Sequence, residues 1–139
     1  WKGEAQEAME VMKKKYPRLQ GVAEEGGKIN MKGEGDVTTD EAMQRLTMFD
    51  PQILLVAFGH PKQEQWIAKH KKDFPNLKAI VGVGGTFTIW AGRLSRAPKW
   101  LRIIGLEWLW RLFLEPKRWK RIWNAVVIFP ISFILNRFV

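Results

Sequence analysis

Two short apolar runs constrain the fold of this chain more than any other feature. Residues 52–58 read QILLVAF and residues 78–83 read KAIVGV, without the alternation of a half-buried strand. Each run stops at a glycine, and residues 63–72 between them place Trp66, Ile67 and His70 at helical spacing. A strand, a helix and a second strand form a right-handed βαβ unit. We therefore predict an α/β fold in which these strands are parallel, close neighbours and covered on both faces.

The segments before this unit also show regular patterns. Residues 3–15 carry apolar side chains at helical spacing, and a second helix is expected to begin at a cap formed by Thr38 or Thr39. Residues 19–23 are consistent with a short strand, and residues 26–36, with four glycines, predict a loop. Pro61 is expected to occupy the first helical position after the first strand.

Length and composition limit the class of protein. With 139 residues, 46% of them hydrophobic, the chain corresponds to about one domain and is not disordered. It has no cysteine and only two histidines, which excludes a disulfide scaffold and makes a metal site unexpected. No cofactor motif is present, because the glycines that follow the two apolar runs do not have the spacing of a dinucleotide-binding loop or a Walker loop. The start at Trp1, where an α/β protein would just have completed a strand, predicts that the chain is a fragment, and no signal peptide is indicated.

The positive charge is concentrated in the tail. Residues 1–95 hold 14 Lys and Arg against 12 Asp and Glu, whereas residues 96–139 hold nine against two. The tail also contains five of the eight tryptophans and ends in the apolar run 125–135. We therefore divide the chain into an α/β part, residues 1–95, and an all-helical, basic and aromatic appendage, residues 96–139.

A segment that combines cations, tryptophans and aliphatic residues suits a nucleic acid or an anionic membrane surface. The apolar ending favours the membrane, because a nucleic-acid binder has little use for it. The run is shorter than the roughly 20 residues needed to span a bilayer, and Pro130 interrupts it, so we expect it to lie on the membrane. The alternative is that it covers a core or an oligomer interface.

Two glycine turns follow the predicted strands and are candidates for anion binding. Ligands of open parallel sheets bind beyond the carboxyl ends of the strands. The first turn offers a glycine, a cation and a side-chain amide, and the second offers flexible amides and a hydroxyl. Together they could hold a diphosphate; alternatively, each is an ordinary strand-to-helix turn. The residues are Gly59, Pro61, Lys62, Gln63, Glu64, Gly84, Gly85 and Thr86.

Other ionisable residues allow two interpretations each. His60 could donate to a phosphate or be solvated, and Glu64 could be a general base or a residue that stabilises a helix start. His70 is expected to be exposed at a helix end. In the tail, Arg111, Arg118 and Arg121 could converge on one anion, or form a solvated face beside an apolar stripe.

Three blocks of sequence resemble the WecG/TagA/CpsF glycosyltransferase family. They are residues 51–64 (PQILLVAFGHPKQE), 81–98 (VGVGGTFTIWAGRLSRAP) and 105–121 (GLEWLWRLFLEPKRWKR). The resemblance implies a Rossmann-like parallel sheet with flanking helices, followed by a helical membrane-binding appendage. It also implies a bacterial enzyme that transfers an N-acetylhexosamine, of the N-acetylmannosamine type, from a UDP-sugar to a polyprenyl-diphosphate-linked sugar at the cytoplasmic membrane face.

The same resemblance assigns roles to residues. The two turns would border the UDP-sugar pocket, with Gln63 contacting the donor, and Arg111, Arg118 and Arg121 would meet the diphosphate of the acceptor or the leaving UDP. The catalytic base is expected in an N-terminal half that this chain lacks, and Thr88 stands where the family usually has Asp. The competing hypotheses are a non-catalytic membrane-surface module and, less favoured, a nucleic-acid binder. Self-association is a further expectation.

Overall fold

The computed structural model describes residues 2–116 and 119–136, without the side chains of residues 121, 122, 125, 126, 134 and 136. The chain divides into two compact units, Trp1–Ser95 and Arg96–Val139. The division falls where the charge composition changes.

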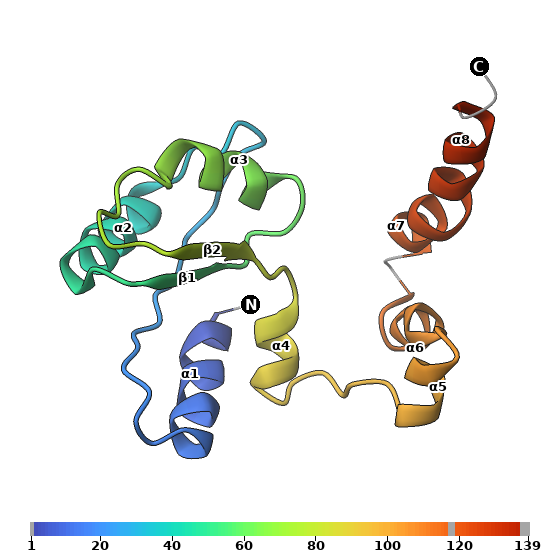
Figure 1. Cartoon of the computed structure of the whole chain (residues 1–139), viewed down its shortest axis with the longest axis horizontal. Coiled ribbons are helices and arrows are strands. Elements are labelled where there is room, and N and C mark those ends of the chain that lie inside the picture. Colours follow the sequence, from blue (N-terminus) through green and yellow to red (C-terminus); the bar gives the residue numbers. More distant parts are fainter. Residues whose placement is uncertain (1, 117–118, 137–139) are drawn as a thin grey trace. The chain divides into compact units, whose positions relative to one another are not determined.

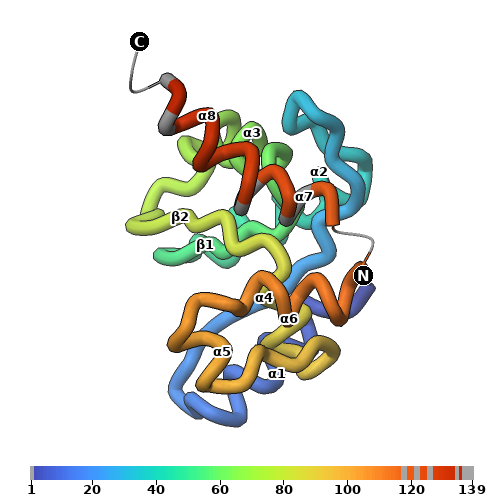
Figure 2. The backbone as a smooth tube through the Cα atoms, turned by 90° about the vertical axis from the view of Figure 1, so that its right-hand side faces the viewer, coloured from blue at the N-terminus to red at the C-terminus, as the bar shows by residue number. Residues whose placement is uncertain are grey.

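A small parallel sheet organises the first unit. Strands β1 (Ile53–Val56) and β2 (Ala79–Gly82) are joined by helix α3 (Lys62–His70), and Ile53 pairs with Ala79. Helices α2 (Val37–Phe49) and α3 lie on one face of the sheet, and α1 (Glu4–Lys15) and α4 (Thr86–Trp90) lie on the other (Figures 1 and 2). The predictions of an α/β fold and of two parallel neighbouring strands are therefore confirmed. A larger Rossmann-like sheet stays a prediction.

The core of this unit lies between the sheet and the α2–α3 layer. Its buried members are Ile29, Leu54, Val56, Trp66 and Phe74. The Trp66 ring lies 5.6 Å from Phe58 and 4.9 Å from His70, between ring centroids. On the opposite face, α1 packs against α4 and buries Ala8.

Some predicted boundaries and exposures differ from the structure. Residues 19–23 form no strand, because the described part of the chain places no strand beside them with which they could pair. Both strands are shorter than predicted, and Ile53 and Val81 are 64% and 46% exposed. A sheet of two short strands is too small for its helices to cover both faces completely, so the prediction of full coverage was wrong.

Two helix starts also differ from the prediction. Asp36, rather than Thr38 or Thr39, caps α2, and its Oδ1 accepts a hydrogen bond of 3.1 Å from the Thr39 N–H. Asp36 also accepts from the Lys28 N–H at 3.0 Å, so one carboxylate closes the loop of residues 26–36 as well as the helix. Pro61 stands at the cap of α3, one position before the first helical residue.

The second unit contains only helices in its described residues. They are α5 (Lys99–Ile103), α6 (Glu107–Leu114), α7 (Trp119–Trp123), a π-helical segment (Asn124–Ile128) and α8 (Phe129–Asn136). Helix α5 ends because Gly105 adopts a φ of 75°, with the Leu106 N–H donating to the Leu101 carbonyl at 2.8 Å.

Pro130 does not end the helical path, contrary to the prediction. Pro130 is the second residue of α8, which continues directly from the π-helical segment, and the wider turn of that segment accommodates a residue that has no backbone N–H. Among the residues that the structure describes, no helix is both long and apolar enough to cross a bilayer.

Candidate functional site

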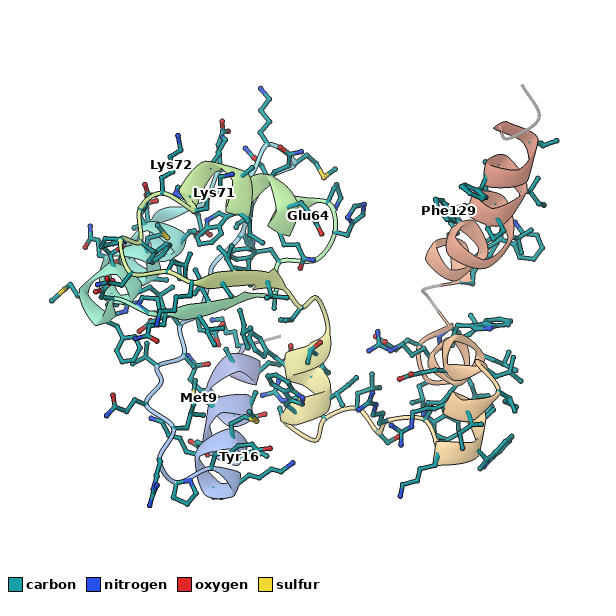
Figure 3. The ribbon with its side chains drawn as sticks, in the orientation of Figure 1. Met9, Tyr16, Glu64, Lys71, Lys72 and Phe129 are labelled. Atoms are coloured by element: carbon teal, nitrogen blue, oxygen red, sulfur yellow. The ribbon has the colours of Figure 1, made fainter. Side chains whose placement is uncertain are left out.

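The two predicted glycine turns meet at one end of the sheet. Because β1 and β2 are parallel, their carboxyl ends share an edge, and Gly59 follows one strand as Gly84 and Gly85 follow the other. The first turn of α3, where Figure 3 labels Glu64, lies at this end. The sequence placed these turns on neighbouring strands, and the structure brings them together.

Gln63 connects the turns directly. Its Oε1 accepts a hydrogen bond of 3.2 Å from the Gly84 N–H, and its Nε2 donates to Glu64 Oε1 at 2.9 Å. The residue is only 6% exposed. A Cβ at Gly82 would lie 2.6 Å from Gln63 Nε2, so a glycine on β2 is what allows this close approach. Gln63 therefore fixes the second turn relative to the start of α3.

Glu64 is part of the same hydrogen-bonded group. The hydrogen bond from Gln63 holds the pKa of Glu64 below its usual value, with smaller contributions from the Glu64 backbone N–H and from His60, and with desolvation opposing. His60 Nδ1 lies 3.3 Å from Glu64 Oε2. Since a carboxyl with a lowered pKa is a weaker base, this environment favours the structural interpretation of Glu64 over general-base catalysis.

Two polar groups of the second turn, the Gly84 N–H and the Thr86 hydroxyl, are engaged in local contacts. The Gly84 N–H is bound to Gln63, and Thr86 Oγ1 donates to the Val83 carbonyl at 2.7 Å. Gly59 and Gly84 have φ values of 78° and 52°, and a Cβ at either would meet nothing within 4 Å. Both glycines are therefore required by backbone conformation, while the space in front of the turns is open.

A cavity of about 430 Å³ opens beside the first turn. Its wall includes Lys62 and also Lys28, from the loop of residues 26–36, together with Ala57 and Phe58 at the end of β1. Two cations beside an open turn suit an anionic ligand. The sequence prediction did not include Lys28; the only local signal was its position after Gly26 and Gly27.

The remaining candidates are placed differently. His70 is the last residue of α3, which confirms its predicted place at a helix end, but it is half-buried against Trp66 and lies 2.8 Å from Asp73 Oδ2 rather than exposed. Arg111 lies half-buried in α6. Arg118 and the side chain of Arg121 lie outside the described residues, so convergence of the three arginines stays a prediction. Within the described part of the chain, no three His, Asp or Glu side chains are grouped to hold a metal ion.

The family model described as "Glycosyl transferase WecG/TagA/CpsF family" matches residues 2–139. The chain belongs to this family. The WecG/TagA/CpsF match includes both turns and the tail.

Two curated members of the WecG/TagA/CpsF family carry the name N-acetylglucosaminyldiphosphoundecaprenol N-acetyl-beta-D-mannosaminyltransferase. The protein from Bacillus subtilis (strain 168) is 39% identical over 79 residues, which are 57% of this chain and 30% of that protein. The protein from Staphylococcus aureus (strain MRSA252) is 34% identical over 120 residues, which are 86% of this chain and 42% of that protein. The chain thus spans less than half the length of these relatives.

Proposed function

We propose that this chain is part of an inverting glycosyltransferase that moves an N-acetylhexosamine, of the N-acetylmannosamine type, from a UDP-sugar to a polyprenyl-diphosphate-linked sugar. The names of the relatives describe a transferase for such an acceptor. The observation that carries the proposal is the pair of open glycine turns joined by Gln63 at the carboxyl end of the sheet. The product would enter bacterial teichoic acid or another cell-surface polysaccharide.

In this proposal the donor diphosphate lies against the turns. Departure of UDP develops negative charge on its diphosphate, and preorganised amides and cations stabilise that charge. Lys62 and Lys28 line the adjoining cavity and supply positive charge, while Gln63 holds the Gly84 turn in place. The substrate-binding set remains Gly59, Pro61, Lys62, Gln63, Glu64, Gly84, Gly85 and Thr86, with the base outside this chain.

The tail would bring the site to the lipid acceptor at the cytoplasmic face of the membrane. Its described helices expose large apolar side chains, including Ile103 at 84%, Phe113 at 80% and Phe129 at 68% (Figure 3 labels Phe129). Apolar area of this kind inserts at a bilayer interface, and the basic residues of the tail attract anionic lipids. Arg111, Arg118 and Arg121 are proposed to meet a diphosphate there.

The deciding experiment is sugar transfer from UDP-N-acetylmannosamine to a lipid-linked acceptor by the full-length protein. We expect Lys62→Ala, Arg118→Ala and Arg121→Ala to lower kcat/KM by roughly tenfold or more each, as losses of charge-assisted contacts. Lys72→Ala, an exposed lysine two residues beyond the far end of α3, is the matched control. Unchanged rates in all three variants would reject the phosphate-binding roles.

A second candidate, a non-catalytic membrane-surface module, is favoured by the exposed apolar residues of the second unit. Co-sedimentation with vesicles of anionic phospholipid tests this part separately. Deletion of residues 111–139 should abolish binding under either proposal, whereas only the enzyme consumes the donor. Binding that survives the deletion would show that the tail is not the anchor.

A further inference from the structure

Residues 11–22 of the first unit form a basic surface that the proposed site does not use. This 11–22 segment contains three consecutive lysines and one arginine but no acidic residue. All four cations, Lys13, Lys14, Lys15 and Arg18, are exposed. Among the described residues, no ion pair joins any of them to a carboxylate. Their positive charge is therefore left to attract an external anion.

The same segment exposes apolar side chains. Its large apolar residues, Val11, Tyr16, Leu19 and Val22, are each at least 37% exposed. Val11 and Lys15 are four residues apart in α1 and so lie on one face of the helix. The Nζ of Lys15 also lies 5.3 Å from the centroid of the Tyr16 ring. Cations and apolar groups that share a surface are typical of segments that lie at an anionic bilayer interface.

A hydrogen-bonded turn orders the middle of the segment. The Tyr16 N–H donates to the Met12 carbonyl at 2.8 Å and closes α1, and the Leu19 N–H donates to the Tyr16 carbonyl at 2.9 Å. Pro17 follows Tyr16 in this turn, at the position where its fixed φ is favoured. The turn therefore holds Tyr16 and Leu19 close together, with Arg18 between them in sequence. Because this arrangement exists before binding, a partner need not pay to order it.

The turn lies at the outer end of α1. The chain that follows it is held against the helix, because a Cβ at Gly21 would lie 2.8 Å from Met9 Cε and Gln6 Nε2 donates to the Ala23 carbonyl at 3.5 Å. Figure 3 labels Tyr16 at the end of α1 that is remote from the sheet. Within the first unit, the 11–22 segment is thus accessible to a flat surface.

The chemistry of the segment favours a membrane over other partners. Burial against another stretch of polypeptide would desolvate four cations that have no carboxylate partner in the described part of the chain. At a bilayer, the charged groups stay among the lipid headgroups while the Tyr16 ring and the Leu19 side chain reach the boundary of the acyl chains. A nucleic acid would use the cations, but it gains little from exposed aliphatic side chains.

We propose that the 11–22 segment is a second membrane contact, which binds the headgroups of anionic phospholipids. This inference rests on the proposed function, in which the tail brings the site to a lipid-linked acceptor. One weak membrane signal gives only marginal, reversible binding, and stable anchoring takes two. The segment therefore strengthens anchoring by the tail and is too weak to replace it. A contact in each unit also restricts the orientation of the first unit at the bilayer.

Binding to vesicles of equal parts phosphatidylglycerol and phosphatidylcholine tests the charges. The 139-residue chain with Lys14→Gln and Lys15→Gln is compared with the chain with Lys71→Gln and Lys72→Gln. Both pairs are exposed lysines at a helix end, and Figure 3 shows Tyr16 and the Lys71–Lys72 pair on opposite sides of the sheet. Because each lysine near an anionic surface changes binding roughly fivefold, the first pair should lower the partition coefficient roughly 25-fold and the second less than about threefold.

A fluorescent label tests whether the turn itself touches the bilayer. The chain has no cysteine, so one polarity-sensitive fluorophore can be attached at a chosen position. A label at Gln20→Cys, next to the turn, should shift its emission to shorter wavelength when the anionic vesicles are added. A label at Lys72→Cys should not shift. The labelled chains and both double variants are first checked for wild-type circular dichroism.

Four results would overturn the proposal. They are equal binding by the two double variants, an unshifted label at position 20 in the vesicle-bound chain, a larger shift of that label with single-stranded RNA than with vesicles, and no binding of the wild type. The first three leave the proposed function standing, because sugar transfer and the deletion of residues 111–139 test it separately. After the fourth, transfer to the acceptor in detergent still decides whether the full-length protein is the enzyme.

Discussion

Replacement of Gln63 by alanine tests whether one side chain holds the two turns together. The change removes the acceptor for the Gly84 N–H, 3.2 Å away, and the donor to Glu64. A hydrogen bond of this kind contributes about 1 kcal/mol net. Loss of one buried methylene adds about 0.8 kcal/mol. We therefore expect Gln63→Ala to lower the free energy of unfolding by about 2 kcal/mol, or Tm by roughly 10 °C for a unit of this size.

Urea unfolding of the 139-residue chain measures this loss, and Gln65→Ala is the matched control. Gln65 is an exposed glutamine on the same helix, so its replacement should change stability by less than about 0.5 kcal/mol. Amide exchange at Gly84 should accelerate only in Gln63→Ala. Equal stability of the two variants, with Gly84 still protected in both, would refute the bridging role of Gln63.

Two further measurements tie the effect to the observed contacts. The pKa of Glu64 should rise toward its ordinary value in Gln63→Ala, because the hydrogen bond that mainly lowers it is gone. A lowered pKa of Glu64 contributes fully to stability only at pH values above the pKa that Glu64 has in the unfolded chain. The difference in the free energy of unfolding between the wild type and Gln63→Ala should therefore shrink as the pH falls through the pKa of Glu64 in the folded chain. Gly82→Ala should destabilise the wild type but cost much less in Gln63→Ala, where the atom 2.6 Å from the new Cβ is absent.

Three other outcomes are expected from the first unit. Arg93 donates two hydrogen bonds of 2.6 Å to the Glu7 carboxylate and thereby lowers the pKa of Glu7. Arg93→Ala should therefore destabilise the chain at pH 7 but have little effect below the pKa of Glu7. Urea unfolding at both pH values measures the difference. Asp36→Asn should retain most of the thermal stability that Asp36→Ala loses, because the Asn amide oxygen can still accept a hydrogen bond from the Thr39 N–H. Equal Tm values for Asp36→Asn and Asp36→Ala would contradict the role of Asp36 as the helix cap. Trp66→Ala should lower the free energy of unfolding by about 3 to 5 kcal/mol as a core truncation. Trp66→Phe should lower it clearly less, because the lost N–H has no partner among the residues that the structure describes.

The βαβ unit was predictable because its signals are local. The apolar runs, the glycines that end them and the helical spacing around Trp66 each depend on a few neighbouring residues. The adjacency of the two turns followed from one further rule, the right-handed parallel crossover.

The features that were missed depend on partners far away in the chain. The Gln63 contact with Gly84 requires the register of β2 against α3, which no local pattern of residues encodes. Asp36 was not predicted as the cap because two threonines followed it, and its second role, accepting from Lys28, appears only when the loop closes. Residues 19–23 have strand-like composition, but a strand exists only where another strand pairs with it.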